Sequence, residues 1–125
     1  LTNFRNAVMK LDSYLATPVV TDRDRSGVIQ AFEFCYELSW TTVKKIAEDR
    51  GLKAPSPIQA FQAAFQMEFI NKDEHAIWLD MKKDRDRTSH TYKEELAKEV
   101  FEKVRNTYLK AFKTLLQRIE GENRP

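Results

Sequence analysis

Turn-forming residues and cysteine are scarce in this sequence. Its 125 residues include 3 Gly, 4 Pro and 1 Cys. Many-stranded sandwiches and barrels need a turn containing Gly or Pro between most strands, so this composition argues against both architectures. Cys35 is the single cysteine, and no internal disulfide can form. One cysteine and two histidines, His75 and His90, are too few for a closed structural zinc site.

Long apolar runs and glycine-rich loops are also missing. The longest uninterrupted apolar run, Ala76 to Leu79, is far shorter than the roughly 18 residues that a membrane span requires. The first residues lack the basic start and the apolar block of a signal peptide, and we therefore expect a cytoplasmic protein with no membrane partner. The three glycines lie too far apart for a phosphate-binding loop such as Walker A or GxGxxG. A net charge of +2 does not by itself indicate nucleic-acid binding.

What the sequence does contain is a balance of 42% hydrophobic and 32% charged residues. That balance is typical of one folded domain, which we place over residues 1–125. Apolar residues recur at steps of three and four along most of the chain, which is the spacing of amphipathic helices. The pattern predicts five helices. The first ends near residue 16, and the other four cover residues 22–51, 57–71, 73–87 and 91–119. We therefore expect an all-α protein, a five-helix up-and-down bundle.

Particular residues indicate where the predicted helices begin and end. Asp22 or Asp24 is expected to cap the second helix, and Gly51 to follow its end. Thr91-x-x-Glu94 has the form of a capping box, which predicts that the fifth helix begins at Thr91. The second helix has apolar residues on most of its sides, so we expect it in the centre of the bundle.

The segment between the fourth and fifth predicted helices carries the most informative polar residues. Arg85 lies seven residues after Trp78, so a guanidinium extends the apolar side of its helix. Such a group needs an anion, either a buried carboxylate or a ligand phosphate, because an unpaired buried charge is costly. His90 is expected in the turn and Tyr92 in the first turn of the next helix. The three side chains would then converge on one groove.

These three groups suit phosphodiester chemistry without a metal ion. Histidine can take a proton from a ribose 2′-hydroxyl or give one to the leaving oxygen, and arginine can neutralise the charge that grows on the phosphorane. The alternative is structural: Arg85 pairs with an acidic residue, and His90 caps a helix end. The spacing alone leaves both interpretations open.

Charged residues elsewhere could complete such a site. Glu33 and Glu37 lie on a narrow polar stripe of the second helix, where one of them either orients Arg85 or faces the groove. An ordinary salt bridge between helices or subunits is the alternative. We expect no metal at this pair, since no Glu-x-x-His spacing accompanies it. Lys82 and its neighbouring cations either contact an RNA backbone or belong to a solvated helix end that also carries Asp86.

Three stretches of the chain resemble a known family. The segment 85–92 has the form R-x4-H-x-Y and resembles the R-x4-6-H motif of HEPN domains, with Asp86 where many members have Asn. The segment 29–40, with the sequence IQAFEFCYELSW, resembles the second helix of one HEPN branch, the nucleotidyltransferase substrate-binding proteins. Together with the segment 78–81, WLDM, the likeness extends over nearly the whole chain.

This resemblance implies a helical bundle that forms a homodimer, so that two copies of Arg85 and His90 meet in one cleft. It also implies a partner, a separate minimal nucleotidyltransferase that is usually encoded beside it. In related toxin–antitoxin pairs the HEPN member is a metal-independent ribonuclease. The transferase silences that member by attaching AMP to the motif tyrosine, which is Tyr92 here. The ligand implied is RNA or a nucleotide, and no cofactor is implied.

Three functions are compatible with these observations. The first is a ribonuclease toxin in which Arg85 and His90 are catalytic. The second is a subunit without a reaction of its own, which presents substrate or nucleotide to the transferase. The third is a purely structural helical adaptor.

Overall fold

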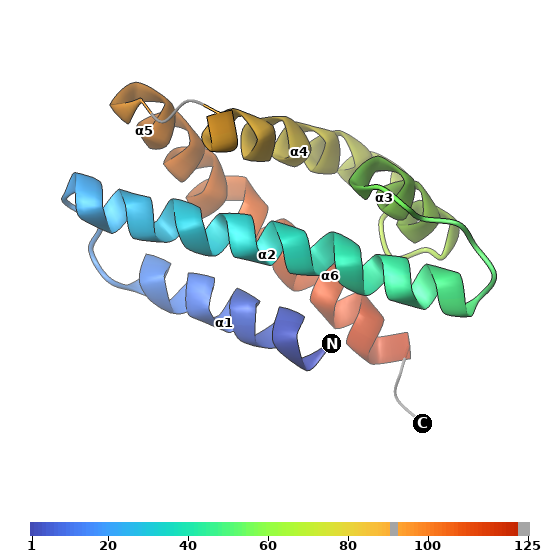
Figure 1. The fold of residues 1–125 in the computed structure, drawn as a ribbon. Coiled ribbons are helices and arrows are strands. Elements are labelled where there is room, and N and C mark those ends of the chain that lie inside the picture. The colour runs from blue at the N-terminus through green and yellow to red at the C-terminus, as the bar shows by residue number, and fades with distance from the viewer. Residues whose placement is uncertain (91–92, 123–125) are drawn as a thin grey trace.

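The structure, a computed structural model, consists of helices whose long members alternate in direction (Figure 1). It describes residues 1–90 and 93–122, except for the side chain of His90. In chain order the elements are α1 (Thr2–Ala16), α2 (Asp22–Asp49), α3 (Pro57–Gln66), the 3-10 turn η1 (Lys72–Glu74), α4 (His75–His90), α5 (Glu94–Lys103), the π-helical turn η2 (Val104–Tyr108) and α6 (Leu109–Glu122). The described residues contain no strand, and none of their helices has the length and apolar character of a bilayer span. Because α5, η2 and α6 continue one another as a single rod, the prediction of an all-α, five-helix bundle is confirmed.

α2 lies at the centre of the bundle, as its sequence predicts. It packs against α1, α3, α4 and α5. The core also contains a cluster of aromatic rings around Phe112 of α6, whose ring centroid lies 6.4 Å from that of Phe4, 6.1 Å from that of Phe32 and 5.7 Å from that of Trp78. All four side chains are buried. One ring thus joins α1, α2, α4 and α6. One side of α2 stays open, since Phe34 is 59% exposed.

The beginning of α2 is fixed by a reciprocal pair of hydrogen bonds. The hydroxyl of Thr21, the N-cap, accepts from the Asp24 N–H at 3.1 Å, and the Asp24 carboxylate accepts from the Thr21 N–H at 3.0 Å. The hydrogen bond from Thr21, together with one from the backbone of Val20, lowers the pKa of Asp24. The prediction that Asp22 or Asp24 caps the helix is therefore wrong, because Asp24 is instead the third residue of a capping box. Gly51 follows the helix end with a φ of 80°, as expected.

α3 and the start of α4 differ from the prediction. α3 ends at Gln66 rather than near Asn71, because the chain turns through Glu68 at a φ of 65°. Asn71 instead caps η1, where its side chain accepts from the Glu74 N–H at 3.0 Å. The fourth helix, expected over residues 73–87, is therefore preceded by this short turn, and α4 itself begins at His75.

α4 is longer than its apolar pattern predicts. It continues through His90, which is its last helical residue and does not lie in a turn as expected. The Ser89 hydroxyl donates to the carbonyl oxygen of Arg85 at 3.0 Å. The Thr88 hydroxyl lies at the same distance from that carbonyl oxygen but donates its proton to Glu33 at 2.8 Å, so both hydroxyls have acceptors without interrupting the helix.

α5 begins later than its sequence predicts, at Glu94. Its N-cap is Lys93, which makes no capping hydrogen bond, so the prediction that the fifth helix begins at Thr91 is wrong. Glu94 is the first helical residue, and it is too close to the helix start to act as the third residue of a capping box. Thr91 and Tyr92 themselves lie outside the described residues.

We expect Phe112→Ala to lower the free energy of unfolding by about 4 kcal/mol, because it removes a fully buried ring and leaves a cavity among the four helices that this ring joins. Phe34→Ala makes the same chemical change at an exposed position and should cost about 0.5 kcal/mol or less. Urea unfolding followed by circular dichroism measures both values. Equal losses in the two variants would contradict this description of the core.

Candidate functional site

An ion pair between Glu33 and Arg85 joins α2 to α4. Arg85 Nη1 donates to Glu33 Oε2 at 3.1 Å, and the Thr88 hydroxyl donates to the same oxygen at 2.8 Å. The side chains of Glu33 and Arg85 are 26% and 24% exposed. The anion that the sequence requires for Arg85 is thus a carboxylate of the chain itself. This contact fits both earlier interpretations of Glu33, as a residue that orients Arg85 and as an interhelical salt bridge.

Glu37 lies on the other side of the same guanidinium. Its Oε1 is 3.8 Å from Arg85 Nε, which is a charge contact without a hydrogen bond, and its Oε2 accepts from Trp40 Nε1 at 3.1 Å. Arg85 Nε is buried and has no hydrogen-bond partner in the described part of the chain. Arg85 is therefore held in place by Glu33 while one of its donors remains unused.

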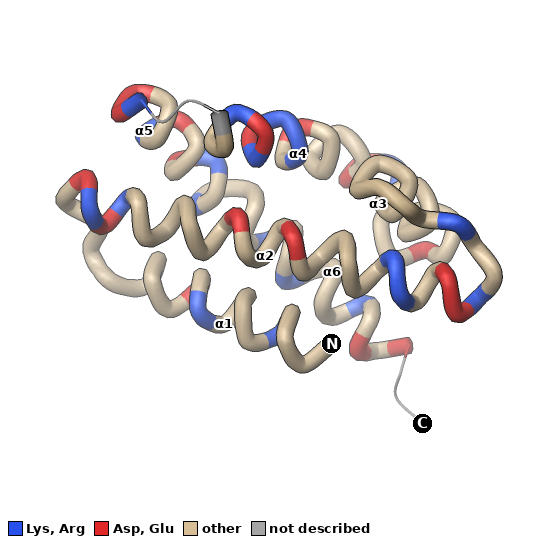
Figure 2. Tube along the Cα trace, viewed as in Figure 1, with Lys and Arg blue, Asp and Glu red and all other residues tan. Residues whose placement is uncertain are grey.

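Lys82 and Asp86 lie on the same helix as Arg85 and pair with each other. Lys82 Nζ donates to Asp86 Oδ2 at 2.7 Å, across one turn of α4. We refer to the six residues Glu33, Glu37, Lys82, Arg85, Asp86 and Thr88 as the α2–α4 cluster. Figure 2 shows the charged positions of α4 gathered in its second half, which runs alongside the part of α2 that carries two acidic positions in its middle. With two cations and three acids, the cluster does not carry a positive charge that would attract nucleic acid by itself.

The structure brings together five of the seven residues that the sequence singles out. Glu33, Glu37, Lys82, Arg85 and Asp86 belong to the α2–α4 cluster. The other two, the side chain of His90 and the whole of Tyr92, lie outside the described residues. The backbone of His90 is described, and it continues α4 five residues beyond Arg85.

The sequence analysis missed the most deeply buried charge of α4, Asp84. Its side chain is 1% exposed, and it accepts hydrogen bonds from Arg87 Nη1 at 3.0 Å and from the hydroxyl of Tyr108. Lys103 Nζ is 3.2 Å away, and Arg87 also pairs with Glu99 at 2.7 Å. Burial and the hydrogen bond to Asp84 raise the pKa of Tyr108. The one available signal was that Asp84 lies three residues after the buried Met81, on an apolar side of the helix.

The π-helical turn η2 explains how two residues of the last rod reach the same acid. Lys103 and Tyr108 are five residues apart, and in an α-helix they would point about 140° away from each other. A π turn closes its hydrogen bonds from i to i+5, so residues five apart lie above one another. Because η2 spans Val104–Tyr108, both side chains meet at Asp84.

α4 is consequently anchored on two sides just before it ends. Arg85 and Thr88 attach it to α2, and Asp84 and Arg87 attach it to the rod formed by α5 and η2. These contacts fix the direction of the last helical turn, which ends at His90. The arrangement can position an arginine and the backbone of a histidine at one end of the bundle.

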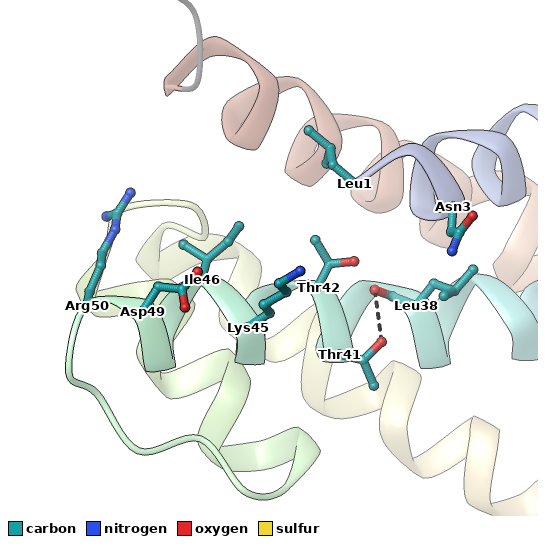
Figure 3. Close-up of a pocket in the computed structure, with 9 residues that line it drawn as sticks. All are labelled: Leu1, Asn3, Leu38, Thr41, Thr42, Lys45, Ile46, Asp49 and Arg50. Carbon is teal, nitrogen blue, oxygen red and sulfur yellow. Dashed lines mark hydrogen bonds between the residues drawn. The ribbon is translucent and has the colours of Figure 1, made fainter.

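A surface pocket of about 580 Å³ lies elsewhere, between the start of α1 and the C-terminal half of α2 (Figure 3). Lys45, Asp49 and Arg50 are its charged residues. Arg50 pairs with Glu122, and the Thr41 hydroxyl bonds to the carbonyl oxygen of Leu38 within its own helix. This pocket contains none of the residues singled out by the sequence. Within the described residues no group of three or more His, Cys, Asp or Glu side chains could hold a metal ion.

The chain is similar to a known protein family and to a solved structure. The family model described as nucleotidyltransferase substrate binding protein like matches residues 1–121. A solved crystal structure of a protein from Thermus thermophilus has a TM-score of 0.83 and 27% sequence identity to the chain, and the match covers 92% of this chain and 97% of that one. No curated protein matches the chain.

We expect Asp84→Asn to cost about 2–3 kcal/mol of stability, because it leaves Lys103 and Arg87 facing a buried site without a carboxylate. Glu33→Gln changes a partly exposed carboxylate and should cost about 1 kcal/mol or less. Urea unfolding of the two variants at neutral pH measures the difference. A larger loss of stability in Glu33→Gln than in Asp84→Asn would contradict the expectation that Asp84 contributes more to stability than Glu33.

Proposed function

The chain belongs to the family of nucleotidyltransferase substrate binding protein-like proteins, and from that membership we propose that it is the HEPN-type partner subunit of a separate minimal nucleotidyltransferase. In this proposal it binds nucleotide or RNA phosphate at a cleft between two copies of the chain and cleaves RNA without a metal ion. The transferase controls it by adding AMP to Tyr92. The family supports the partnership, and the R-x4-H-x-Y motif of residues 85–92 supports the chemistry.

The observation that carries the proposal is the state of Arg85. Its guanidinium is fixed by Glu33 and Thr88, yet its Nε–H is buried without a hydrogen-bond partner in the described residues. A donor that is already oriented, and that need not be rearranged, stabilises the charge developing on a phosphate more effectively than a solvated one. Arg85 also lies about one and a half turns before His90 on the same helix.

The reaction assigned to this site is transesterification. The 2′-oxygen of a ribose attacks the adjacent phosphorus, the O2′–P bond forms, and the P–O5′ bond breaks. One His90 takes the proton of the 2′-hydroxyl, and a second His90 gives a proton to the leaving 5′-oxygen. A single imidazole cannot hold both protonation states at once, which is why the proposal places two copies of the chain at one cleft. Arg85 neutralises the phosphorane, and the products are a 2′,3′-cyclic phosphate and a free 5′-hydroxyl.

The second candidate function is a substrate-binding subunit without a reaction of its own. Two observations favour it: the description of the family, and the excess of acids over cations in the α2–α4 cluster. In this case Arg85 would bind the phosphate of a nucleotide that the transferase uses. This function would be distinguished from the ribonuclease by a stable complex with the transferase, and by activity that appears only when the two proteins are mixed.

For the ribonuclease, we expect the purified protein to cleave single-stranded RNA in EDTA and to leave 2′,3′-cyclic phosphate ends. His90→Ala should abolish cleavage, and Arg85→Ala should slow it by about 100-fold or more, as for loss of one charge-stabilising donor. His75→Ala removes the other histidine of the chain, at the start of α4, and should leave the rate unchanged. Intact RNA after incubation with micromolar wild-type protein, or equal losses in His75→Ala and His90→Ala, would refute the catalytic assignment.

For the control by the transferase, we expect co-expression with the neighbouring transferase gene to increase the intact mass of the chain by one adenylate. Tyr92→Phe should prevent the increase, whereas Tyr14→Phe, at an exposed tyrosine of α1, should not. Mass spectrometry of the purified chain measures this directly. An unmodified chain that also fails to copurify with the transferase would contradict the partnership of these two proteins.

A further inference from the structure

Two buried hydrogen-bond donors at the α2–α4 contact have no acceptor in the described part of the chain. One is Arg85 Nε, and the other is the hydroxyl of Tyr36. Both atoms are themselves buried, so bulk water does not satisfy either donor. Buried polar groups in native proteins nearly always have a partner, and the exceptions call for an explanation.

The ring of Tyr36 is explained by packing, but its hydroxyl is not. The ring lies 5.9 Å from that of Phe61 in the core, a contact that phenylalanine would make equally well. Among the described residues, the other fully buried tyrosine is Tyr108, which uses its hydroxyl to donate to Asp84. The two side chains therefore form a natural comparison: one buried hydroxyl with a partner and one without.

Tyr36 lies among the residues of the α2–α4 cluster. It is three residues after Glu33 and directly before Glu37 on α2, and the charges that act on its hydroxyl are those of Asp86, Glu37 and Arg85. Burial, followed by the charges of Asp86 and Glu37, raises the pKa of Tyr36. The hydroxyl therefore keeps its proton near neutral pH and acts as a donor.

The carboxylates around this hydroxyl are engaged with other groups. Glu33 accepts from Arg85 and Thr88, Glu37 accepts from Trp40, and Asp86 accepts from Lys82. None of them hydrogen-bonds to Tyr36. Within the described residues, therefore, no side chain accepts from the Tyr36 hydroxyl or from Arg85 Nε, and an oxygen of a bound ligand can fill that role.

We infer that Tyr36 is a ligand-binding residue, whose hydroxyl donates a hydrogen bond to a phosphoryl oxygen of a nucleotide held by Arg85. This inference rests on the proposed function, in which Arg85 binds phosphate. Glu37 is the group that the phosphate replaces: its carboxylate is 48% exposed and lies 3.8 Å from Arg85 Nε without hydrogen-bonding to it. When Glu37 moves outward, Arg85 Nε and the Tyr36 hydroxyl remain as two oriented donors.

The test measures binding of AMP to the full chain by isothermal titration calorimetry, with adenosine and inorganic phosphate as comparison ligands. Tyr36→Phe should weaken AMP binding about tenfold, as for loss of one hydrogen bond to a charged group, and should leave the melting temperature unchanged or higher. Tyr108→Phe is the matched control: it should lower the melting temperature and leave AMP affinity within about twofold. Glu37→Gln, which alters a surface group, should strengthen AMP binding several-fold, because it removes a competing negative charge.

The outcomes separate this inference from the function on which it rests. If Arg85→Ala binds AMP as the wild type does, or if the wild type does not bind AMP, the phosphate site at Arg85 is wrong and so is the role of Tyr36. If Arg85→Ala loses AMP binding while Tyr36→Phe retains it, the phosphate site at Arg85 is correct but the role of Tyr36 is wrong. A water molecule, and not the ligand, then accepts the hydrogen bond of the Tyr36 hydroxyl. Equal affinity for adenosine and AMP would show that the phosphoryl group is not what the site recognises, and would also overturn the inference.

Discussion

α4 carries two adjacent opposite charges, Asp84 and Arg85, and each must be neutralised on a different side of the helix. Consecutive residues of an α-helix point about 100° apart, so Asp84 faces the rod of α5 and η2 while Arg85 faces α2. A buried charge without a partner costs several kcal/mol, so both neighbouring elements have to supply one. The relative placement of α2, α4 and the last rod therefore depends on charge pairing as well as on the aromatic core, and the candidate site is one of these pairings.

The helical fold follows from the sequence because apolar spacing and burial have the same period. The ends of the helices are less predictable, since several side chains near one end can accept the same backbone hydrogen bond. Thr21 is the N-cap of α2, although aspartate, present at positions 22 and 24, is an equally suitable N-cap residue. α4 extends past its apolar pattern because Thr88 reaches Glu33, a residue far away in the chain. The spacing of neighbouring residues carries no information about a contact between residues so far apart in the chain.

In the candidate site, too, some features could be predicted from the sequence and others could not. The pairing of Arg85 with an acid could be predicted, because a guanidinium on the apolar side of a helix needs an anion, and α2 offers Glu33 and Glu37. Asp84 stands in the same charged stretch as Asp86, and only its position three residues after Met81 distinguishes it in the sequence. Their exposures, 1% and 56%, differ because the last rod covers one of them and not the other. The sharing of Asp84 by two residues of that rod depends on η2, and the chain offers no simple pattern for a π turn.

The π turn also has a consequence for how this protein can change in length. α5 lies against α2, and α6 lies against α1, so the two halves of the last rod present their apolar sides to different neighbours. A π turn uses five residues where an α-helix uses four for nearly the same rotation, so deleting one residue within η2 would restore an α-helix and leave Phe112 and Ile119 facing the interior. If all five residues were kept and became α-helical instead, every residue after them would rotate by about 100°, and those two side chains would turn away from the interior. The orientation of the C-terminal helix thus depends on one surplus residue, and the last rod should tolerate the loss of a residue at η2 better than a loss further along α6.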